Sequence, residues 1–303
     1  MDPLRHVMMR IPGRSFPMNS NYSDRNALRA LRGDKRVEDL IQRAAAELTR
    51  ARHAIALTGA GISTESGIPD YRGRNGVWTK NPEAERKAYE VYDQFKADPK
   101  KYWEERLDPQ GPTSRLFAVL GEMGKFGPNA GHYALAELEK MGILKCIITQ
   151  NVDGLHEKAG SKNVIEFHGG INKFRCMLCN KRFRRDELDF EKMKIGGTVP
   201  PYCQCGGVIK DDGVFFGEPI PSDVIQRSQK EAWECDLMLI CGTSAVVYPF
   251  AGLPETVNQG TRIIEVNADR TPLTGRVSDY LIQGKTGEIL PKIVEEVKSI
   301  LKG

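Results

Sequence analysis

Short apolar runs that alternate with helical patterns restrict the fold of this chain more than any other feature. Such runs occupy residues 53–58, 144–149, 164–167, 236–242 and 262–267. Segments with apolar residues at helical spacing lie at 37–51, 129–142, 222–234 and 287–301, and two short helices broken at Asp98-Pro99 are expected within 84–106. Strands that alternate with helices in this way predict an α/β fold with a mainly parallel sheet.

Small, polar or ionisable residues follow every expected strand. In chain order, the sequences after the strands are GAGISTESG, QNVDGLH, HGG, GTS and NADR. Ligands of parallel sheets bind at the carboxyl ends of the strands, whereas a purely structural sheet needs no such residues at every end. The pattern therefore indicates that the protein acts on a ligand.

The loop after the first strand, GAGISTESGIPDYRG at residues 59–73, contains the glycines of a phosphate-binding turn. Gly59 and Gly61 permit close backbone approach, and a helix that begins near Ser63 would direct free N–H groups at an anion. However, Gly67 comes too late for the dinucleotide fingerprint, and no convincing acidic partner follows it. An ordinary strand-to-helix turn is the alternative, but the small and polar residues after the last two strands favour a dinucleotide site.

Two close cysteine pairs indicate a metal site. Cys176 and Cys179 form a C-x-x-C pair, Cys203 and Cys205 form a C-x-C pair, and twenty-three residues without a histidine separate the pairs. Four thiolates in this arrangement suit tetrahedral structural zinc, and a redox dithiol is the alternative. The metal would stabilise a segment, 171–212, that is too small to form its own core.

The other three cysteines, Cys146, Cys235 and Cys241, stand singly in apolar runs and are expected to be buried. An odd total of seven argues against a disulfide framework and for a reducing compartment, so we expect a cytoplasmic location. The net charge of +4 is too small to indicate direct binding to nucleic acid. No stretch approaches the roughly 20 apolar residues of a membrane span, so no membrane association is expected.

The first 35 residues are polar and arginine-rich, with no apolar run long enough for a secretory signal. They could form a flexible arm, a transit-like segment or an overlong start. The flexible arm is the preferred interpretation.

His168 stands in EFHGG, between the third strand and the cysteine segment. A lone histidine is often only a polar residue with satisfied hydrogen bonds, but its pKa near neutrality also makes it a usable general base. The basic run KRFRR at 181–185 is expected to be a solvated face, with a docking patch for an acidic partner as the alternative.

The motifs GAGIS, GIPDYR, TQNVDGLH, FHGG, the cysteine pairs, FFGE, GTS and VN resemble those of sirtuins in kind and order, over about residues 37–303. Sirtuins are NAD-dependent protein lysine deacylases. The resemblance implies an α/β fold with a Rossmann-like parallel sheet and a small inserted zinc-binding domain, and an active site between them. The expected regions are a flexible arm at 1–35, an NAD-binding domain at 36–170 and 213–303 that includes a helical part of the small lobe at 74–110, and a zinc insert at 171–212.

The resemblance also implies the residues of an NAD site. Those near the pyrophosphate are Gly59, Ala60, Gly61 and Ser63. A mobile loop that closes over NAD supplies Ile68, Pro69, Asp70, Tyr71 and Arg72, and family members often have phenylalanine in place of this tyrosine. Those lining nicotinamide and its ribose are Gln150, Asn151 and Asp153. Those on the phosphates and the adenosine half are Gly242, Thr243, Ser244 and Asn267.

The reaction that the resemblance implies transfers the acyl group from lysine to ADP-ribose. The acyl oxygen attacks the anomeric carbon, nicotinamide leaves, and His168 deprotonates a ribose hydroxyl that attacks the acyl carbon. Asn151 would place the ribose or a water, Asp153 would orient its neighbours, and the one zinc on Cys176, Cys179, Cys203 and Cys205 would do no chemistry. The partners would be acylated-lysine proteins or peptides, bound by strand addition along Val214, Phe215, Phe216 and Gly217.

Other activities remain open at this point. The same site could transfer ADP-ribose to protein or hydrolyse NAD, whereas a nicotinamide dehydrogenase and a non-enzymatic zinc module fit the motifs less well. Sirtuins that favour acidic acyl groups have a tyrosine and an arginine three residues apart after the cofactor loop, whereas Tyr102 and Arg106 are four apart here. We therefore expect acetyl or longer apolar acyl groups rather than succinyl. The aromatic residues of this segment, Tyr89, Tyr92, Phe95 and Trp103, are expected to form local core.

Overall fold

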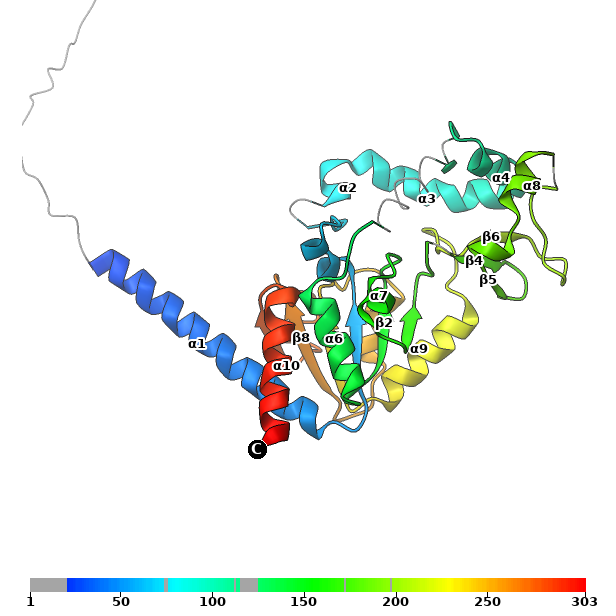
Figure 1. Cartoon of the computed structure of the whole chain (residues 1–303). Coiled ribbons are helices and arrows are strands. Elements are labelled where there is room, and N and C mark those ends of the chain that lie inside the picture. Colours follow the sequence, from blue (N-terminus) through cyan, green and yellow to red (C-terminus); the bar gives the residue numbers. More distant parts are fainter. Residues whose placement is uncertain (1–20, 74–75, 112, 115–124, 172, 197) are drawn as a thin grey trace, which may run out of the picture. The chain divides into compact units, whose positions relative to one another are not determined.

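The structure of the chain is a computed structural model that describes residues 21–73, 76–111, 113–114, 125–171, 173–196 and 198–303 (Figure 1). The chain divides after Asp39, and the unit from Leu40 to Gly303 contains every strand of the described residues. None of the helices in the described ranges is both long and apolar enough to cross a bilayer.

A six-stranded parallel sheet in the order β3-β2-β1-β7-β8-β9 forms the centre of this unit. Its strands are β1 (Ala54–Thr58), β2 (Leu144–Thr149), β3 (Val164–Glu166), β7 (Leu237–Cys241), β8 (Arg262–Asn267) and β9 (Tyr280–Gln283). The first five confirm the strands expected from the apolar runs, and β9 was not expected. The chain order reverses between β1 and β7, where ligands of such sheets bind.

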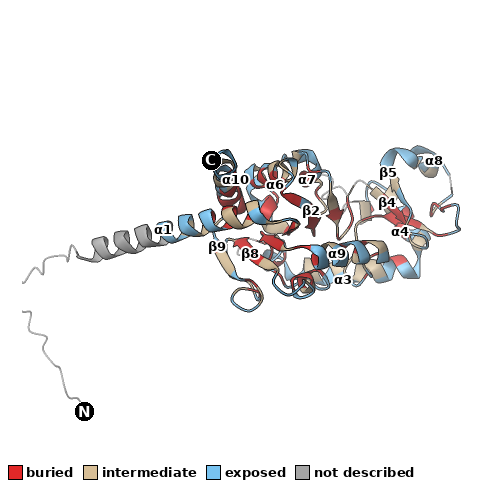
Figure 2. Cartoon of the chain, turned by 90° about the horizontal axis from the view of Figure 1, so that it is seen from below, coloured by how far each residue is buried: buried red, intermediate tan, exposed pale blue. Residues whose placement is uncertain are grey.

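Both faces of the sheet are covered, which is why its central strands are continuous apolar runs. On one face, Ile55 and Leu57 pack with Met238 and Ile240 against α9 (Ser222–Glu234) and η3 (Phe250–Glu255). On the other, α6 (Ala130–Lys140) and α10 (Thr286–Lys302) lie side by side (Figure 1). Figure 2 shows buried residues concentrated in the strands between these helices.

The first helix begins earlier than the sequence indicates. The apolar pattern predicts a helix at 37–51, but α1 spans Asn21–Arg50 and so includes much of the expected flexible arm. From Leu40 onward, α1 contributes Ile41, Ala44 and Leu48 to the core, each fully buried. Its first half has too few regularly spaced apolar residues to predict a helix. Residues 1–20 of the expected arm lie outside the described residues.

A second, antiparallel sheet carries Cys176 at the end of one strand, and the segments that connect its strands carry Cys179, Cys203 and Cys205. Its order is β5-β4-β6, with β4 (Lys173–Cys176), β5 (Arg182–Arg184) and β6 (Ile209–Asp211). The short elements η2 (Arg185–Glu187) and α8 (Phe190–Lys194) connect β5 toward the second cysteine pair. We call residues 173–211, within their described ranges, the cysteine module.

Helices α2 (Val77–Lys80), α3 (Pro82–Ala97) and α4 (Pro99–Leu107) lie before the module in sequence, and α3 and α4 share a core with it. Asp98 ends α3 and caps α4 by accepting a hydrogen bond from Lys101 N–H at 2.9 Å, which confirms the expected break. Phe95 and Trp103 are buried in the shared core, where Trp103 Nε1 donates to Ile209 C=O at 2.8 Å.

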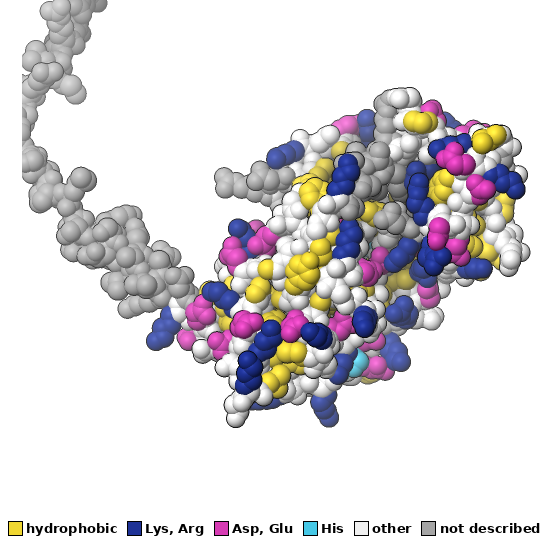
Figure 3. All heavy atoms as spheres, in the orientation of Figure 1, with side chains coloured by type: hydrophobic (Ala, Val, Ile, Leu, Met, Phe, Trp, Pro, Cys, Tyr) yellow, Lys and Arg dark blue, Asp and Glu magenta, His cyan; other side chains and the backbone are white. Residues whose placement is uncertain are grey.

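The surface carries charges of both signs. On the face in Figure 3, Lys and Arg side chains are interspersed with Asp and Glu. In the basic run, Arg182 pairs with Asp223 at 2.7 Å and Arg184 pairs with Asp186 at 2.9 Å. Because these arginines are already paired with carboxylates of the same chain, a solvated face is favoured over a docking patch for an acidic protein.

Candidate active site

The loops after β1 and β7 meet backbone to backbone at the point where the chain order reverses. Gly61 N–H donates to Gly242 C=O at 2.7 Å. A Cβ on Gly61 would lie 2.6 Å from the Gly242 oxygen, and one on Gly242, whose φ is 60°, would lie 2.3 Å from Ile62 N. Neither position has room for a side chain. The helix expected near Ser63 is a 3-10 helix, η1 (Ala60–Ser66).

Polar side chains from the β1 and β2 loops form one connected cluster. Ser63 Oγ donates to Asp153 Oδ2 at 2.7 Å, and Asn151 Nδ2 donates to Ser63 Oγ and to Gly59 C=O, both at 3.1 Å. The other Asp153 oxygen accepts from Leu155 N–H at 3.0 Å, at the start of α7 (Leu155–Ala159). These contacts are those of a carboxylate that orients its neighbours.

Thr243 connects three strand ends. Its Oγ1 accepts from Gln150 Nε2 at 2.9 Å, and its C=O accepts from Asn267 Nδ2 at 3.0 Å. The structure therefore brings the expected residues after β2, β7 and β8 together. Ser244 and Pro69 are exposed beside this set, and Ala60 is half-buried.

The GIPDYR segment leaves η1 as a loop rather than as a continued helix. Ile68 is buried, and Asp70 Oδ1 accepts from Gly73 N–H at 2.9 Å. The Arg72 guanidinium lies 4.4 Å above the Trp78 ring, and the Tyr71 ring centroid is 4.8 Å from that of Trp78. The loop therefore packs on Trp78.

Trp78 also contacts the segment expected to bind substrate. Its ring centroid is 4.9 Å from that of Phe216, and Tyr89 lies 4.9 Å from Phe216 on another side. Tyr89 is about half exposed, so its main role is in this contact rather than in the local core expected for it. Sequence reasoning missed Trp78, and its only signal was a large aromatic residue shortly after the cofactor loop.

His168 lies in the turn after β3, where the structure favours one tautomer. Its Nδ1 is 3.2 Å from Gln150 C=O, so Nδ1 carries the proton and Nε2 keeps its lone pair. Burial lowers the pKa of His168 to about 4, and the hydrogen bond to the Gln150 carbonyl only partly opposes this shift. Burial therefore favours the neutral form of the half-buried ring, which lies beside Phe167 and Phe250 and keeps Nε2 free as a proton acceptor.

Residues 214–217 differ from expectation because they form a turn rather than a strand. Val214 N–H donates to His168 C=O at 2.8 Å, which ties this segment to the histidine. A strand needs a pairing neighbour, and none of the strands in the described residues pairs with 214–217.

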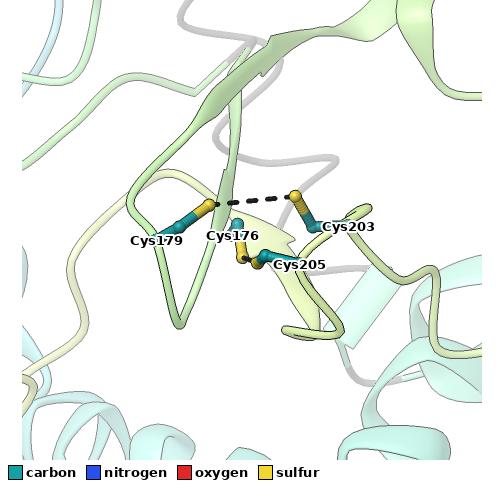
Figure 4. Close-up of side chains that lie close together, drawn as sticks. All are labelled: Cys176, Cys179, Cys203 and Cys205. Carbon is teal, nitrogen blue, oxygen red and sulfur yellow. Dashed lines mark hydrogen bonds between the residues drawn. The ribbon is translucent and has the colours of Figure 1, made fainter.

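The four cysteines of the module form one cluster (Figure 4). Their Sγ atoms all lie within 4.8 Å of one another, with Cys176 and Cys205 3.4 Å apart and Cys179 and Cys203 3.8 Å apart. Tetrahedral zinc with Zn–S bonds of about 2.3 Å requires sulfurs roughly 3.8 Å apart. The donor set and its spacing therefore fit a zinc ion.

Two buried histidines near the polar cluster are expected to make the folded protein less stable at acidic pH. His132 and His156 are fully buried, and burial lowers their pKa values to about 4 and about 3, with the nearby Asp153 opposing the shift at His132. Both pKa values are depressed, so between about pH 6.5 and 4 the unfolded chain binds protons that the folded chain does not. These two histidines should therefore make stability fall with decreasing pH in this window by at most about 2.7 kcal/mol per pH unit, and His168, whose pKa burial also lowers to about 4, should add about half as much again.

Urea unfolding between pH 7 and pH 5 measures this effect. His156→Gln should reduce the pH dependence of the unfolding free energy by about a third, because His132 and His168 remain. The same change at half-buried His53, which lies beside Glu231, is the matched control. An unchanged pH dependence in His156→Gln would contradict the prediction.

Comparisons with known proteins agree on one family. The model of the Sir2 family matches residues 59–249. An NAD-dependent protein deacetylase of Saccharolobus solfataricus is 44% identical over 263 residues, which cover 86% of this chain and 98% of that protein.

Two solved structures add bound ligands to this likeness. A Sir2 homologue mutant in complex with ADP-ribose matches with a TM-score of 0.68 and 38% identity, covering 85% of this chain and 96% of that one. A Sir2 mutant with a deacetylated p53 peptide and 3'-O-acetyl-ADP-ribose matches with a TM-score of 0.63 and 32% identity, covering 83% and 96%.

Proposed function

The chain belongs to the Sir2 family and is an NAD-dependent protein deacylase, and we propose that His168 is the general base of its reaction. The reaction converts acyl-lysine, NAD and one water into lysine, nicotinamide and O-acyl-ADP-ribose. The observation that carries the proposal is the contact of His168 Nδ1 with Gln150 C=O at 3.2 Å, which holds the proton on Nδ1 and leaves the Nε2 lone pair free. When bound, NAD supplies the ribose carbon that is attacked and the nicotinamide leaving group. His168 Nε2 would accept the proton of a ribose hydroxyl.

The residues around His168 divide into two proposed binding regions. The NAD region comprises Gly59, Ala60, Gly61, Ser63, Ile68, Pro69, Asp70, Tyr71, Arg72, Gln150, Asn151, Asp153, Gly242, Thr243, Ser244 and Asn267. The acyl-lysine region comprises Val214, Phe215, Phe216 and Gly217. The glycine contact between the β1 and β7 loops supports the first, because it brings the backbones of both loops together at the carboxyl ends of the strands, where ligands of parallel sheets bind. The tie between Val214 and His168 supports the second.

We propose one structural zinc on Cys176, Cys179, Cys203 and Cys205. All four ligand positions would be filled by protein, so the ion would stabilise the module without taking part in the reaction. The proposed domains remain a Rossmann-like domain at 36–170 and 213–303, with 74–110 in the small lobe, and a zinc insert at 171–212. A cytoplasmic location is proposed from the free cysteines outside the cluster.

The contacts of Tyr102 and Arg106 support a preference for apolar acyl groups. Tyr102 OH donates to Asp211 Oδ2 at 2.7 Å, and Arg106 Nη2 lies 3.3 Å from Asp211 Oδ1. Both side chains are thus directed at an internal carboxylate, which is itself buried. A succinyl group would bring a second carboxylate into this region, where the cation of Arg106 is already paired with Asp211.

Mass spectrometry of reactions with NAD and matched acetyl-lysine and succinyl-lysine peptides tests the function and the preference together. We expect nicotinamide and O-acetyl-ADP-ribose to appear together with deacetylated peptide. The succinyl peptide should react at least about tenfold more slowly, since burying an unpaired carboxylate is costly. Faster desuccinylation would overturn the preference. Nicotinamide without deacylated peptide would favour ADP-ribose transfer or NAD hydrolysis.

A further inference from the structure

Two cations of the cysteine module are buried where the module faces the acyl-lysine segment. Arg175 lies on β4 and Lys210 on the neighbouring strand β6, and their side chains are 3% and 0% exposed. Buried charges are tolerated only when they are paired and hydrogen-bonded. Neither residue has a role in the reaction proposed above. The function of this cluster of buried charges is therefore inferred from the partners of Arg175 and Lys210.

Glu218 is the shared partner of both cations. Its Oε1 lies 2.5 Å from Arg175 Nη2 and its Oε2 lies 3.2 Å from Lys210 Nζ, with the carboxylate only 1% exposed. The same Oε2 accepts from Phe215 N–H at 2.9 Å, and Glu218 N–H donates to Phe215 C=O at 3.0 Å. Glu218 therefore closes the turn at 215–218 and fastens it to β4 and β6.

Lys210 holds the same segment at a second point. Its Nζ donates to Gly213 C=O at 2.7 Å and lies 4.1 Å above the Phe215 ring. The segment is therefore fixed at Gly213, at Phe215 and at Glu218. The residues between these points, Val214 and Phe216, are the ones that meet His168 and Trp78.

Arg175 extends the cluster to the turn that carries His168. Its Nε lies 3.4 Å from Asp212 Oδ1, and Asp212 Oδ2 accepts from Gly170 N–H at 3.2 Å. One buried guanidinium thus reaches the acyl-lysine segment through Glu218 and the HGG turn through Asp212.

We propose that Glu218 is a positioning residue for the peptide substrate. By pairing with Arg175 and Lys210, it fixes the turn at 215–218, and with it the position of the acyl-lysine region against which the peptide would bind. This inference rests on the proposed function, because it assigns a cause to the placement of the proposed acyl-lysine region. It does not place Glu218 in contact with substrate.

The test compares Glu218→Gln with the parent protein in steady-state deacetylation. We expect KM for a long acetyl-lysine peptide to rise about tenfold, while kcat and KM for NAD change by less than about threefold. A single blocked acetyl-lysine lacks the flanking backbone. Its kcat/KM should therefore change little. We call the ratio of kcat/KM for the peptide to kcat/KM for the single residue the peptide advantage, and this ratio should fall by about tenfold.

Asp211→Asn is the matched control because Asp211 is equally buried on β6 but faces Tyr102 and Arg106 on α4. It should destabilise the module without changing the peptide advantage. Lys210→Met provides a second variant, since it keeps the Arg175–Glu218 pair while removing the contacts of Lys210 with Gly213, Phe215 and Glu218. It should give a smaller loss of the same kind.

Three outcomes would overturn the proposal. One is an unchanged peptide KM in Glu218→Gln and Lys210→Met. Another is an equal loss of peptide advantage in Asp211→Asn, which would show a general structural effect. The third is an absence of deacylation by the parent protein, which would overturn the proposed function as well. It can be told from the other two because it would be seen without any substitution.

Discussion

Replacing His168 with alanine is expected to reduce kcat for deacylation by about a thousandfold, which is within the usual contribution of a general base. The reason is geometric, because the described residues around the ring offer no second histidine. His132 and His156 are fully buried beneath the polar cluster. The measurement is the rate of O-acetyl-ADP-ribose formation from NAD and an acetyl-lysine peptide, followed by mass spectrometry.

His53→Ala is the control for this substitution. His53 precedes β1, whereas the proposed site lies at the opposite, carboxyl end of that strand, so the control should retain the parent rate. The melting temperature of both variants should stay close to that of the parent protein. Retention of more than about a tenth of the activity in a folded His168→Ala protein would contradict the assignment of the base.

Cys176→Ser is expected to abolish stoichiometric zinc binding and to unfold the cysteine module. Cys176 is fully buried and belongs to the core that the module shares with α3 and α4, so the substitution removes a ligand and places a hydroxyl in an apolar site. Structural zinc contributes about 10–16 kcal/mol to the folding of small zinc domains, so its loss should exceed the stability of the module. Deacylation should be lost with it.

Metal analysis of the purified protein, with thermal unfolding and activity, measures these effects. The parent chain should bind one zinc at its one four-cysteine cluster. Cys235→Ala is the matched control, because Cys235 is a buried cysteine in the core of the larger sheet. It should keep the zinc and cost about 1 kcal/mol. Full activity and an unchanged melting temperature after chelation would refute a structural role.

Elements were most predictable from the sequence where their burial imposes a recognisable pattern of apolar residues. Central strands covered on both faces must be apolar throughout, so the strands at 54–58 and 237–241 were predictable from composition alone. The edge strand β9, YLIQ, is short and partly exposed, and it therefore lacks this pattern. The cysteine cluster was predictable because metal geometry restricts the spacing of ligands.

The contacts that shape the site were less predictable from the sequence because they join residues far apart in the chain. Arg175 and Glu218 stand 43 positions apart in the sequence, yet their side chains meet in the interior. The contact of Trp78 with Phe216 likewise depends on how the helices after the cofactor loop approach the cysteine module. Family resemblance supplied the roles of His168 and the NAD loop, whereas the supporting cluster required coordinates.

The position of Trp78 has a thermodynamic consequence. One indole contacts both Tyr71 of the proposed cofactor loop and Phe216 of the proposed acyl-lysine segment. A ligand that orders this ring from one side lowers the entropy that the second ligand must lose on the other side. With the proposed roles, NAD and the acyl-peptide would each raise the affinity for the other, and by the same factor, because coupling between two binding equilibria is reciprocal.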